Sequence, residues 1–394
     1  MDLLRASGRW IAGAALALAL VSTAAFAADP FDVYVVLTMT GPNAFAGSDA
    51  HETLVAFQNV VNREGGIRGR PLNFVFQDSQ GNPQTAVALT NEVLTKHPAL
   101  IVGDTSVATC NAMAPLLKSG PVQFCLSPGF RPERDGYSYS VGLSAIEQAQ
   151  VLFRNLRERG LTRVALVVAT DATGRLAEPE FAATAALPEN RAIALVTIEH
   201  FNPTDMNVAA QVARIRAANA QVVIAWVNGS PFGTVVRSMK DAGLSLPLYA
   251  GVGNLNYKEL QTFGPWLPND LYFCCVGPIP AAGQPLLNGP LKAAQTKYAE
   301  TFRTLGIKPS YSHAGAWDTG LVVVAALRAL GPDATPAQVR SFVNNLHDVA
   351  GIEAVFDFRS GDMRGLPISF ARSLRWDQSK EAWFVASGPG GSLR

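Results

Sequence analysis

Short runs of apolar residues alternate with longer amphipathic segments through most of the chain. Many of the runs are rich in Val, Ile and Ala without interruption by charge, as in strands that are buried on both faces of a sheet. Strands are predicted at residues 31–38, 72–77, 100–102, 121–126, 164–168, 192–198, 222–227 and 246–250. Because helical segments separate them, the pattern predicts a mostly parallel α/β sheet with right-handed crossovers.

The amphipathic segments repeat apolar residues at intervals of three and four, the period of a helix with one buried face. In residues 49–63, Leu54, Phe57 and Val61 follow this spacing, and the glycines that follow suit a left-handed helix end. Further helices are predicted at residues 84–95, 109–118, 206–218, 232–242, 290–305, 315–330 and from 335 onward. Residues 354–385 have the pattern of strands and turns.

The N-terminus has the pattern of a secretory signal peptide. Arg5 and Arg9 precede an apolar run over residues 11–28 that contains the small-residue motif Ala25-Phe26-Ala27. A transmembrane anchor is the alternative, but the run is slightly short of the roughly 20 apolar residues that a span needs, and no basic cluster follows it. We therefore expect residues 1–27 to be removed and the mature chain to be periplasmic.

Composition narrows the function classes. The chain has 394 residues, of which 48% are hydrophobic and 16% charged, so it has enough apolar material for about two domains. Its formal net charge is +1, from 32 basic and 31 acidic residues. Without a basic excess to neutralise phosphates, nucleic acid is not an expected partner.

The four cysteines suit an oxidising compartment. Cys110 and Cys125 form either a disulfide or two buried thiols, and the sequence leaves both open. Cys274 and Cys275 are adjacent in a strand-like run, where successive side chains point to opposite faces. We therefore expect no bond between these two. No cysteine spacing is that of a zinc site.

Catalytic signatures are missing from the sequence. The five histidines are dispersed, and His51-Glu52 lacks the second histidine of a zinc-protease helix. Neither a Gly-x-Ser-x-Gly elbow nor a phosphate-binding loop occurs. We expect no enzyme activity, cofactor or metal. Small and polar loops follow the predicted strands, where open α/β sheets bind ligands; they are residues 38–47, 104–107, 127–131, 170–174, 228–230 and 251–254.

Six segments in order resemble a known family. They read LTMTGPNAFAGSD (37–49), VNREGGIRGRPLNFVFQDSQGNPQTAVALTNEVL (61–94), VGDTSVATCNAMAPLL (102–117), SPGF (127–130), MKDAGL (239–244) and AGAWDTGLVVVAAL (314–327). The chain resembles the type I periplasmic solute-binding proteins of the Leu/Ile/Val-binding family, which serve ABC importers. The resemblance covers residues 31 to about 377.

The resemblance implies two doubly wound, Rossmann-like α/β lobes that a three-crossover hinge joins and that close around a ligand. We place the crossovers near residues 143, 276 and 352. Lobe 1 then comprises residues 28–143 and 277–352, and lobe 2 residues 144–276 and 353–386. Residues 387–394 would form a flexible tail. The expected partners are a small-molecule ligand and an inner-membrane ABC permease, and the protein is expected to be a monomer.

Carried over residue by residue, the resemblance places ten residues at the ligand. They are Phe45, Ala46, Ser106, Val107, Gly129, Phe130, Arg131, Thr173, Asn228 and Val252. Val252 aligns near the acidic residue that holds the ammonium group in amino-acid binders. A buried ammonium without a counter-charge is costly, so a free α-amino acid is not the expected ligand.

Arg131 has two interpretations. It either holds a ligand carboxylate with its guanidinium fork or is a solvated loop residue. The first favours an organic or aromatic carboxylate as ligand. The function predicted is that of a substrate-binding component of an ABC importer. The alternatives are a periplasmic sensor of the same fold and, from a different class, an exported α/β enzyme.

Overall fold

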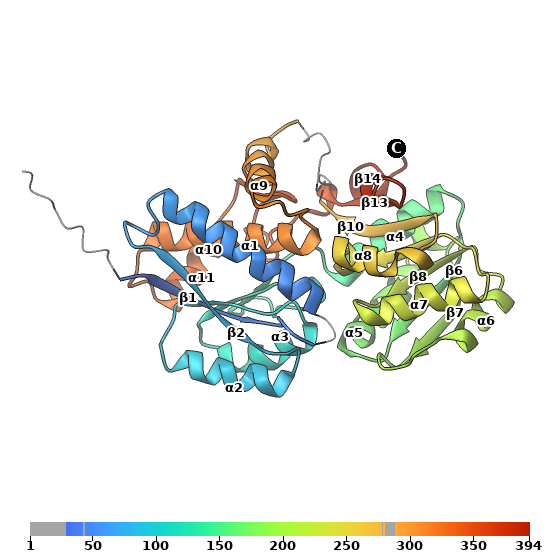
Figure 1. The fold of residues 1–394 in the computed structure, drawn as a ribbon, viewed down its shortest axis with the longest axis horizontal. Coiled ribbons are helices and arrows are strands. Elements are labelled where there is room, and N and C mark those ends of the chain that lie inside the picture. Colours follow the sequence, from blue (N-terminus) through green and yellow to red (C-terminus); the bar gives the residue numbers. More distant parts are fainter. Residues whose placement is uncertain (1–28, 42–43, 278, 280–287) are drawn as a thin grey trace, which may run out of the picture.

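The computed structural model describes residues 29–41, 44–277, 279 and 288–394, and it divides into two α/β lobes that lie side by side (Figure 1). The alternating pattern predicts the α/β character, and the family resemblance implies the two lobes. The predicted signal peptide lies outside the described residues. Within the described ranges, no helix combines the length and apolar character that crossing a membrane requires.

Lobe 1 contains a five-stranded parallel sheet in the order β2-β1-β3-β4-β5. Its inner strand β1 is largely apolar and buried along most of its length, as expected for a strand covered on both faces. The strands are β1 (Phe31–Leu37), β2 (Leu72–Asp78), β3 (Leu100–Val102), β4 (Val122–Cys125) and β5 (Ser138–Ser140). The helices are α1 (Ala44–Arg63), α2 (Pro83–Leu94), α3 (Val107–Met113), α9 (Lys292–Leu305), α10 (Tyr311–Leu330) and α11 (Pro336–Asn344).

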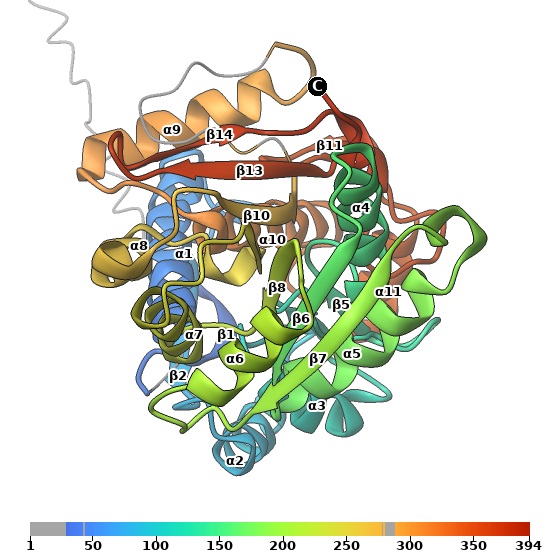
Figure 2. The same cartoon turned by 90° about the vertical axis from the view of Figure 1, so that its right-hand side faces the viewer.

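Lobe 2 contains a seven-stranded sheet in the order β14-β13-β10-β9-β8-β6-β7. The strands are β6 (Arg163–Ala169), β7 (Ala194–Phe201), β8 (Val222–Trp226), β9 (Leu248–Gly251), β10 (Leu271–Val276), β13 (Arg372–Asp377) and β14 (Ala382–Val385). Only β13 and β14 run antiparallel to their neighbours; Figure 2 shows them beyond β10 at one edge of the lobe. The helices are α4 (Ala145–Glu158), α5 (Ala172–Ala185), α6 (Ala209–Ala217), α7 (Ser230–Asp241) and α8 (Tyr257–Phe263).

The third crossover lies later in the chain than predicted. A short hairpin, β11 (Val349–Ala350) with β12 (Val355–Phe356), turns the chain back onto lobe 1. Beyond it, Phe358 N donates to Leu346 O (2.9 Å) and Ser140 N donates to Met363 O (3.1 Å). The chain joins the lobe 2 sheet only at β13. The boundary expected at residue 352 is therefore wrong for residues 353 to about 366, which pack on lobe 1.

The last residues are docked, which corrects the expectation of a flexible tail. Asn155 Nδ2, on α4, donates to Gly391 O (3.0 Å), and Leu393 N donates to Glu158 Oε2 (2.6 Å). Ser387 is buried, and its hydroxyl accepts from Ser373 N. The high glycine and serine content of 387–394 suggested fraying, but α4 supplies acceptors and donors that fix its backbone.

The structure decides between the two alternatives for Cys110 and Cys125, and it differs from the expectation for Cys274 and Cys275. Cys110 on α3 and Cys125 on β4 form a disulfide with their Cα atoms 6.1 Å apart. Cys274 and Cys275, at the end of β10, are also paired, contrary to expectation. The expectation that they point to opposite faces assumed regular strand geometry.

Candidate ligand-binding site

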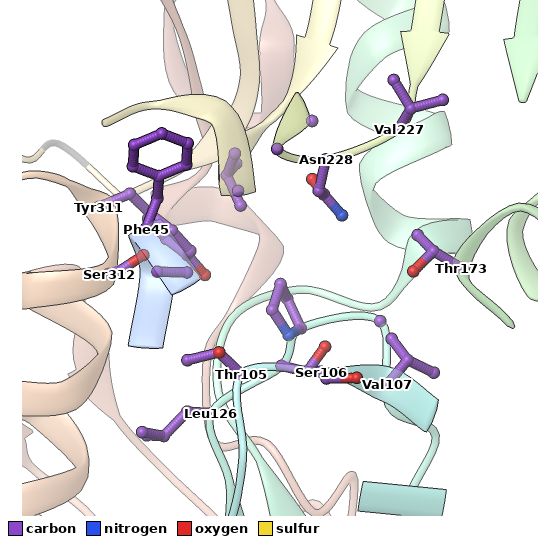
Figure 3. A pocket seen from close by; sticks show the side chains of 18 of the residues that line it. Phe45, Thr105, Ser106, Val107, Leu126, Thr173, Val227, Asn228, Tyr311 and Ser312 are labelled. Carbon is purple, nitrogen blue, oxygen red and sulfur yellow. The ribbon is translucent and has the colours of Figure 1, made fainter. Parts of the chain in front are cut away.

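A cavity of about 350 Å³ lies between the lobes, within the range of sites for small molecules. Its walls come from the loops after β1, β3 and β4 and the start of α10 in lobe 1, and from the loops after β6, β8 and β9 in lobe 2. Figure 3 shows side chains from both lobes around the same space. This is the edge at which parallel α/β sheets bind ligands.

In lobe 1 a buried carboxylate fixes the loops that approach the cavity. Asp104, just after β3, accepts from Thr38 N (3.0 Å), Thr38 Oγ1 (2.7 Å) and Ser79 Oγ (2.5 Å). These donors come from the ends of β1 and β2, so one side chain aligns three strand ends. The Cys110–Cys125 disulfide ties the following helix α3 to β4. Thr105, Ser106 and Val107 are thereby presented to the cavity on a rigid base.

In lobe 2 an amide joins two of the loops. Asn254 Oδ1 accepts from Gly229 N (3.1 Å), and its Nδ2 donates to Val227 O (2.6 Å), so the loops after β8 and β9 are held together. Asp171 caps α5 by accepting from Gly174 N (2.9 Å). These contacts position Asn228, Val252 and Thr173 at the cavity.

Eight of the ten predicted ligand residues line the cavity: Phe45, Ala46, Ser106, Val107, Gly129, Thr173, Asn228 and Val252. Phe130 does not line it; its ring is buried against the Cys110–Cys125 disulfide. Arg131 does not line it either. Its guanidinium forms an ion pair with Glu180 on α5, and its side chain is 65% exposed. The position of Arg131 therefore gives no support to a carboxylate-holding role.

The sequence reading missed residues from three helices. Tyr311, Ser312, Gly315 and Ala316 at the start of α10 line the cavity, as do Gln148 on α4 and Glu259 on α8. Helix α10 follows the first cavity loop by more than two hundred residues, so its position depends on the whole topology. The Ser310 cap at the start of α10 is the local signal that could have drawn attention to its first turn.

A buried arginine braces the cavity loop at residues 127–130 from behind. Arg364 donates to Pro128 O (3.0 Å), Gly142 O (3.2 Å) and the carbonyl of Phe130. Burial lowers the pKa of Arg364 to about 10, so it stays charged at neutral pH. Its fork links the last lobe 1 segment to both the cavity loop and the first crossover.

The cavity wall carries little charge. Among the described residues, no Lys, Arg or His lines it, and its acidic groups are Asp171 and Glu259. Burial, reinforced by the nearby Asp49 carboxylate, raises the pKa of Glu259 well above its usual range. Its neutral form is therefore favoured at neutral pH. The remaining wall consists of hydroxyl, amide and apolar groups, including Phe45 and Trp226.

One cluster outside the cavity has the residue types of a metal site. Asp49, Glu52 and His313 each bring one ligand atom within 4.8 Å of the others. The Lys258 ammonium already lies 3.1 Å from Glu52 Oε1 and 3.6 Å from Asp49 Oδ1. His313 Nδ1 accepts from Ser310 N (3.0 Å). These partners make the cluster a polar junction of the protein's own groups.

Two α/β lobes with a largely uncharged cavity between them define a solute-binding protein of the hinge-closing class. A family model described as periplasmic binding protein matches residues 32–380. The chain belongs to this family, whose members are periplasmic, bind small solutes and work with ABC transporter permeases. The resemblance to type I Leu/Ile/Val-binding proteins is thus confirmed.

Individual proteins that are similar to this chain are also named as binding proteins. The "Leu/Ile/Val-binding protein homolog 3" of Brucella melitensis is 23% identical over 262 residues, which are 61% of this chain and 68% of that protein. A branched-chain amino acid transporter substrate-binding protein of Streptococcus pneumoniae, solved with isoleucine, has a TM-score of 0.74 at 15% identity, covering 91% of this chain and 99% of that one. A fatty acid ABC transporter substrate-binding protein of Thermomonospora curvata has a TM-score of 0.76 at 15% identity, covering 92% of each chain. At these identities the solved structures show the fold alone.

Proposed function

We propose that this protein captures a small solute in the cavity between its lobes and delivers it to an ABC permease after export through the N-terminal signal. The observation that carries this proposal is the cavity itself, because residues of both lobes line it and, within the described part of the chain, no Cys, His or Lys does. A ligand that contacts both walls stabilises the closed arrangement, which is the form a permease would recognise.

We further propose that the solute is a small organic or aromatic carboxylate, and not a free branched-chain amino acid. Val252 is apolar, and the resemblance aligns it near the acid of amino-acid binders; burial also favours the neutral form of Glu259. The remaining carboxylate of the wall, Asp171, already accepts from Gly174 N at the start of α5, so an ammonium group would have to share it. Because Arg131 pairs with Glu180, the ligand carboxylate would be held by uncharged donors such as the Thr105 and Ser106 hydroxyls.

Matched probes test the two levels of the proposal. Mass spectrometry first identifies any solute retained by the purified mature protein. Thermal unfolding is then followed with isovalerate, valine and benzoate; a probe at about 100 times its Kd stabilises the protein by about 2.7 kcal/mol. Greater stabilisation by valine than by isovalerate would refute the ligand class and leave the binding function intact. Chemical conversion of a stabilising probe would refute the binding function.

A further inference from the structure

The lobes touch on two sides of the cavity, and the two sets of contacts differ in kind. Figure 3 shows Phe45, Tyr311 and Ser312 on one side of the cavity and Val107 and Thr173 on the other. The first side adjoins the hinge: a Cβ atom on Gly142, in the first crossover, would lie 2.6 Å from the Tyr311 hydroxyl oxygen. The second side carries the start of α5.

On the hinge side, several buried contacts join the start of α8 in lobe 2 to α1 and α10 in lobe 1. Tyr311 N donates to Leu255 O (3.0 Å), and Tyr257 N donates to Ser310 Oγ (3.1 Å). The Asn256 amide donates to the Asp49 carboxylate, and both side chains are buried. We call this set the α8–α10 seam. Opening it would leave backbone and carboxylate groups without partners, which is costly.

On the opposite side, α3 of lobe 1 approaches α5 of lobe 2, and the salt bridge that spans the lobes there, among the described residues, joins Arg131 and Glu180. Arg131 follows the cavity loop that ends at Gly129 in lobe 1, and Glu180 lies on α5 in lobe 2. The Arg131 side chain is 65% exposed and that of Glu180 is 12% exposed. When this pair separates, water solvates the guanidinium at once, so separation costs little compared with the seam.

We propose that Arg131 and Glu180 form a catch that holds the cleft shut on the side away from the hinge, while the α8–α10 seam stays intact as the pivot. Both are positioning residues, since neither lines the cavity. The pair biases the equilibrium between open and closed lobes, and it therefore tunes the apparent affinity for any solute. Because the pair is exposed, salt weakens it.

The test uses the full mature chain without ligand, so it does not depend on the proposed solute. Spin labels are attached at Lys96→Cys in lobe 1 and Ala213→Cys in lobe 2, both exposed positions, and the inter-lobe distance distribution is measured. The variants are Arg131→Glu, Glu180→Arg and the exchanged pair carrying both. Arg154→Glu is the matched control. Arg154 pairs with Glu158 within α4, so this substitution makes the same charge change at an ion pair that lies inside one lobe.

At low salt, each single catch variant should reduce the closed-to-open ratio about two- to five-fold, the range expected for an exposed pair. The exchanged pair should restore the ratio, 0.5 M salt should bring the unmodified protein close to the single variants, and Arg154→Glu should change nothing. An unchanged distribution in Arg131→Glu, or no restoration in the exchanged pair, would overturn the catch.

Hydrogen exchange tests the pivot in the same samples. The amides of Tyr257 and Tyr311 donate across the seam, so they should stay protected in Arg131→Glu as in the unmodified protein. Loss of their protection on opening of the catch would show that the seam opens too and would overturn the pivot. Loss of probe binding in Arg131→Ala without any change in inter-lobe distance would instead return Arg131 to a ligand-holding role.

Discussion

Glu353 is buried in lobe 1 beside Gly277, which follows β10 at the second crossover. Its neighbour Asp318, on α10, accepts from Ile352 N (2.7 Å) and Glu353 N (3.1 Å). Burial raises the pKa of Asp318 to about 7, and burial together with Asp318 raises the pKa of Glu353 to about 8. The folded protein therefore holds protons on this pair at pH values where the unfolded chain has released them.

This proton retention predicts how stability depends on pH. Between about pH 4.5 and 8 the folded state binds more protons than the unfolded state, so the free energy of unfolding falls as pH rises. Glu353→Gln should remove part of this dependence, so that its free energy of unfolding falls by about 3 kcal/mol less between pH 5 and 8 than that of the unmodified protein. Urea unfolding at both pH values measures it, with Glu300→Gln, exposed on α9, as the control. Parallel pH profiles for Glu353→Gln and the unmodified protein would contradict the prediction.

At the scale of elements, both lobes start a cavity helix in the same way. A Cβ atom on Gly47 of α1 would overlap Thr38 O, and one on Gly174 of α5 would overlap Ala169 O. In each lobe the first helical turn thus packs directly on the end of the preceding strand. This close approach puts the preceding residues, Ala46 and Thr173, at the cavity wall.

Alanine at either glycine should displace the helix start. We expect Gly47→Ala and Gly174→Ala each to cost about 1–3 kcal/mol of stability, as overpacking does. Gly251→Ala is the steric control, since its Cβ would meet nothing closer than Trp226 at 3.9 Å and its φ of −65° suits alanine. Its cost should stay near 0.5 kcal/mol or less. Urea midpoints compare the three, and equal costs would disprove the close-packing argument.

The helix bounds show which elements could be predicted from the sequence. Long periodic helices were predicted within a few residues: 290–305 is α9 (Lys292–Leu305), and 232–242 is α7 (Ser230–Asp241). Helix α10 begins at Tyr311, four residues before the predicted start at 315, because its first turn is anchored by Ser310 and not by an apolar stripe. That missed turn holds the cavity residues Tyr311 and Ser312. Periodicity reports the buried face of a helix and carries no signal for a cap that faces a cleft.

At the scale of the whole molecule, the sequence located most cavity loops but not the contacts between lobes. Eight cavity residues follow strands, and the rule that ligands sit at strand ends applies to each lobe separately. Arg131 also follows a strand, but its partner Glu180 lies on a helix of the other lobe. The third crossover likewise depends on the short β11–β12 hairpin folding back on lobe 1. The ion pair and the crossover both depend on how the two lobes pack together, and local sequence patterns do not encode that packing.

The meeting of the lobes also limits the size of the ligand. The cavity holds about 350 Å³, and contacts on both of its sides close it between the α8–α10 seam and the Arg131–Glu180 pair. In a series of homologues of the retained solute, thermal stabilisation should grow by about 0.8 kcal/mol for each added buried CH₂ until the cavity is full. A longer homologue should then bind more weakly and hold the lobes apart.

Two measurements on the same samples distinguish this limit from simple loss of contact. Small-angle scattering should give a larger radius of gyration with the oversized homologue than with the best-fitting one, because the lobes cannot close over it. The Arg131→Glu variant lacks the proposed catch, so its lobes are already less closed. In this variant the oversized homologue should therefore lose less thermal stabilisation, relative to the best-fitting one, than in the unmodified protein. Stabilisation that keeps rising with length, at constant radius of gyration, would mean that the ligand extends into solvent and is not enclosed by the lobes.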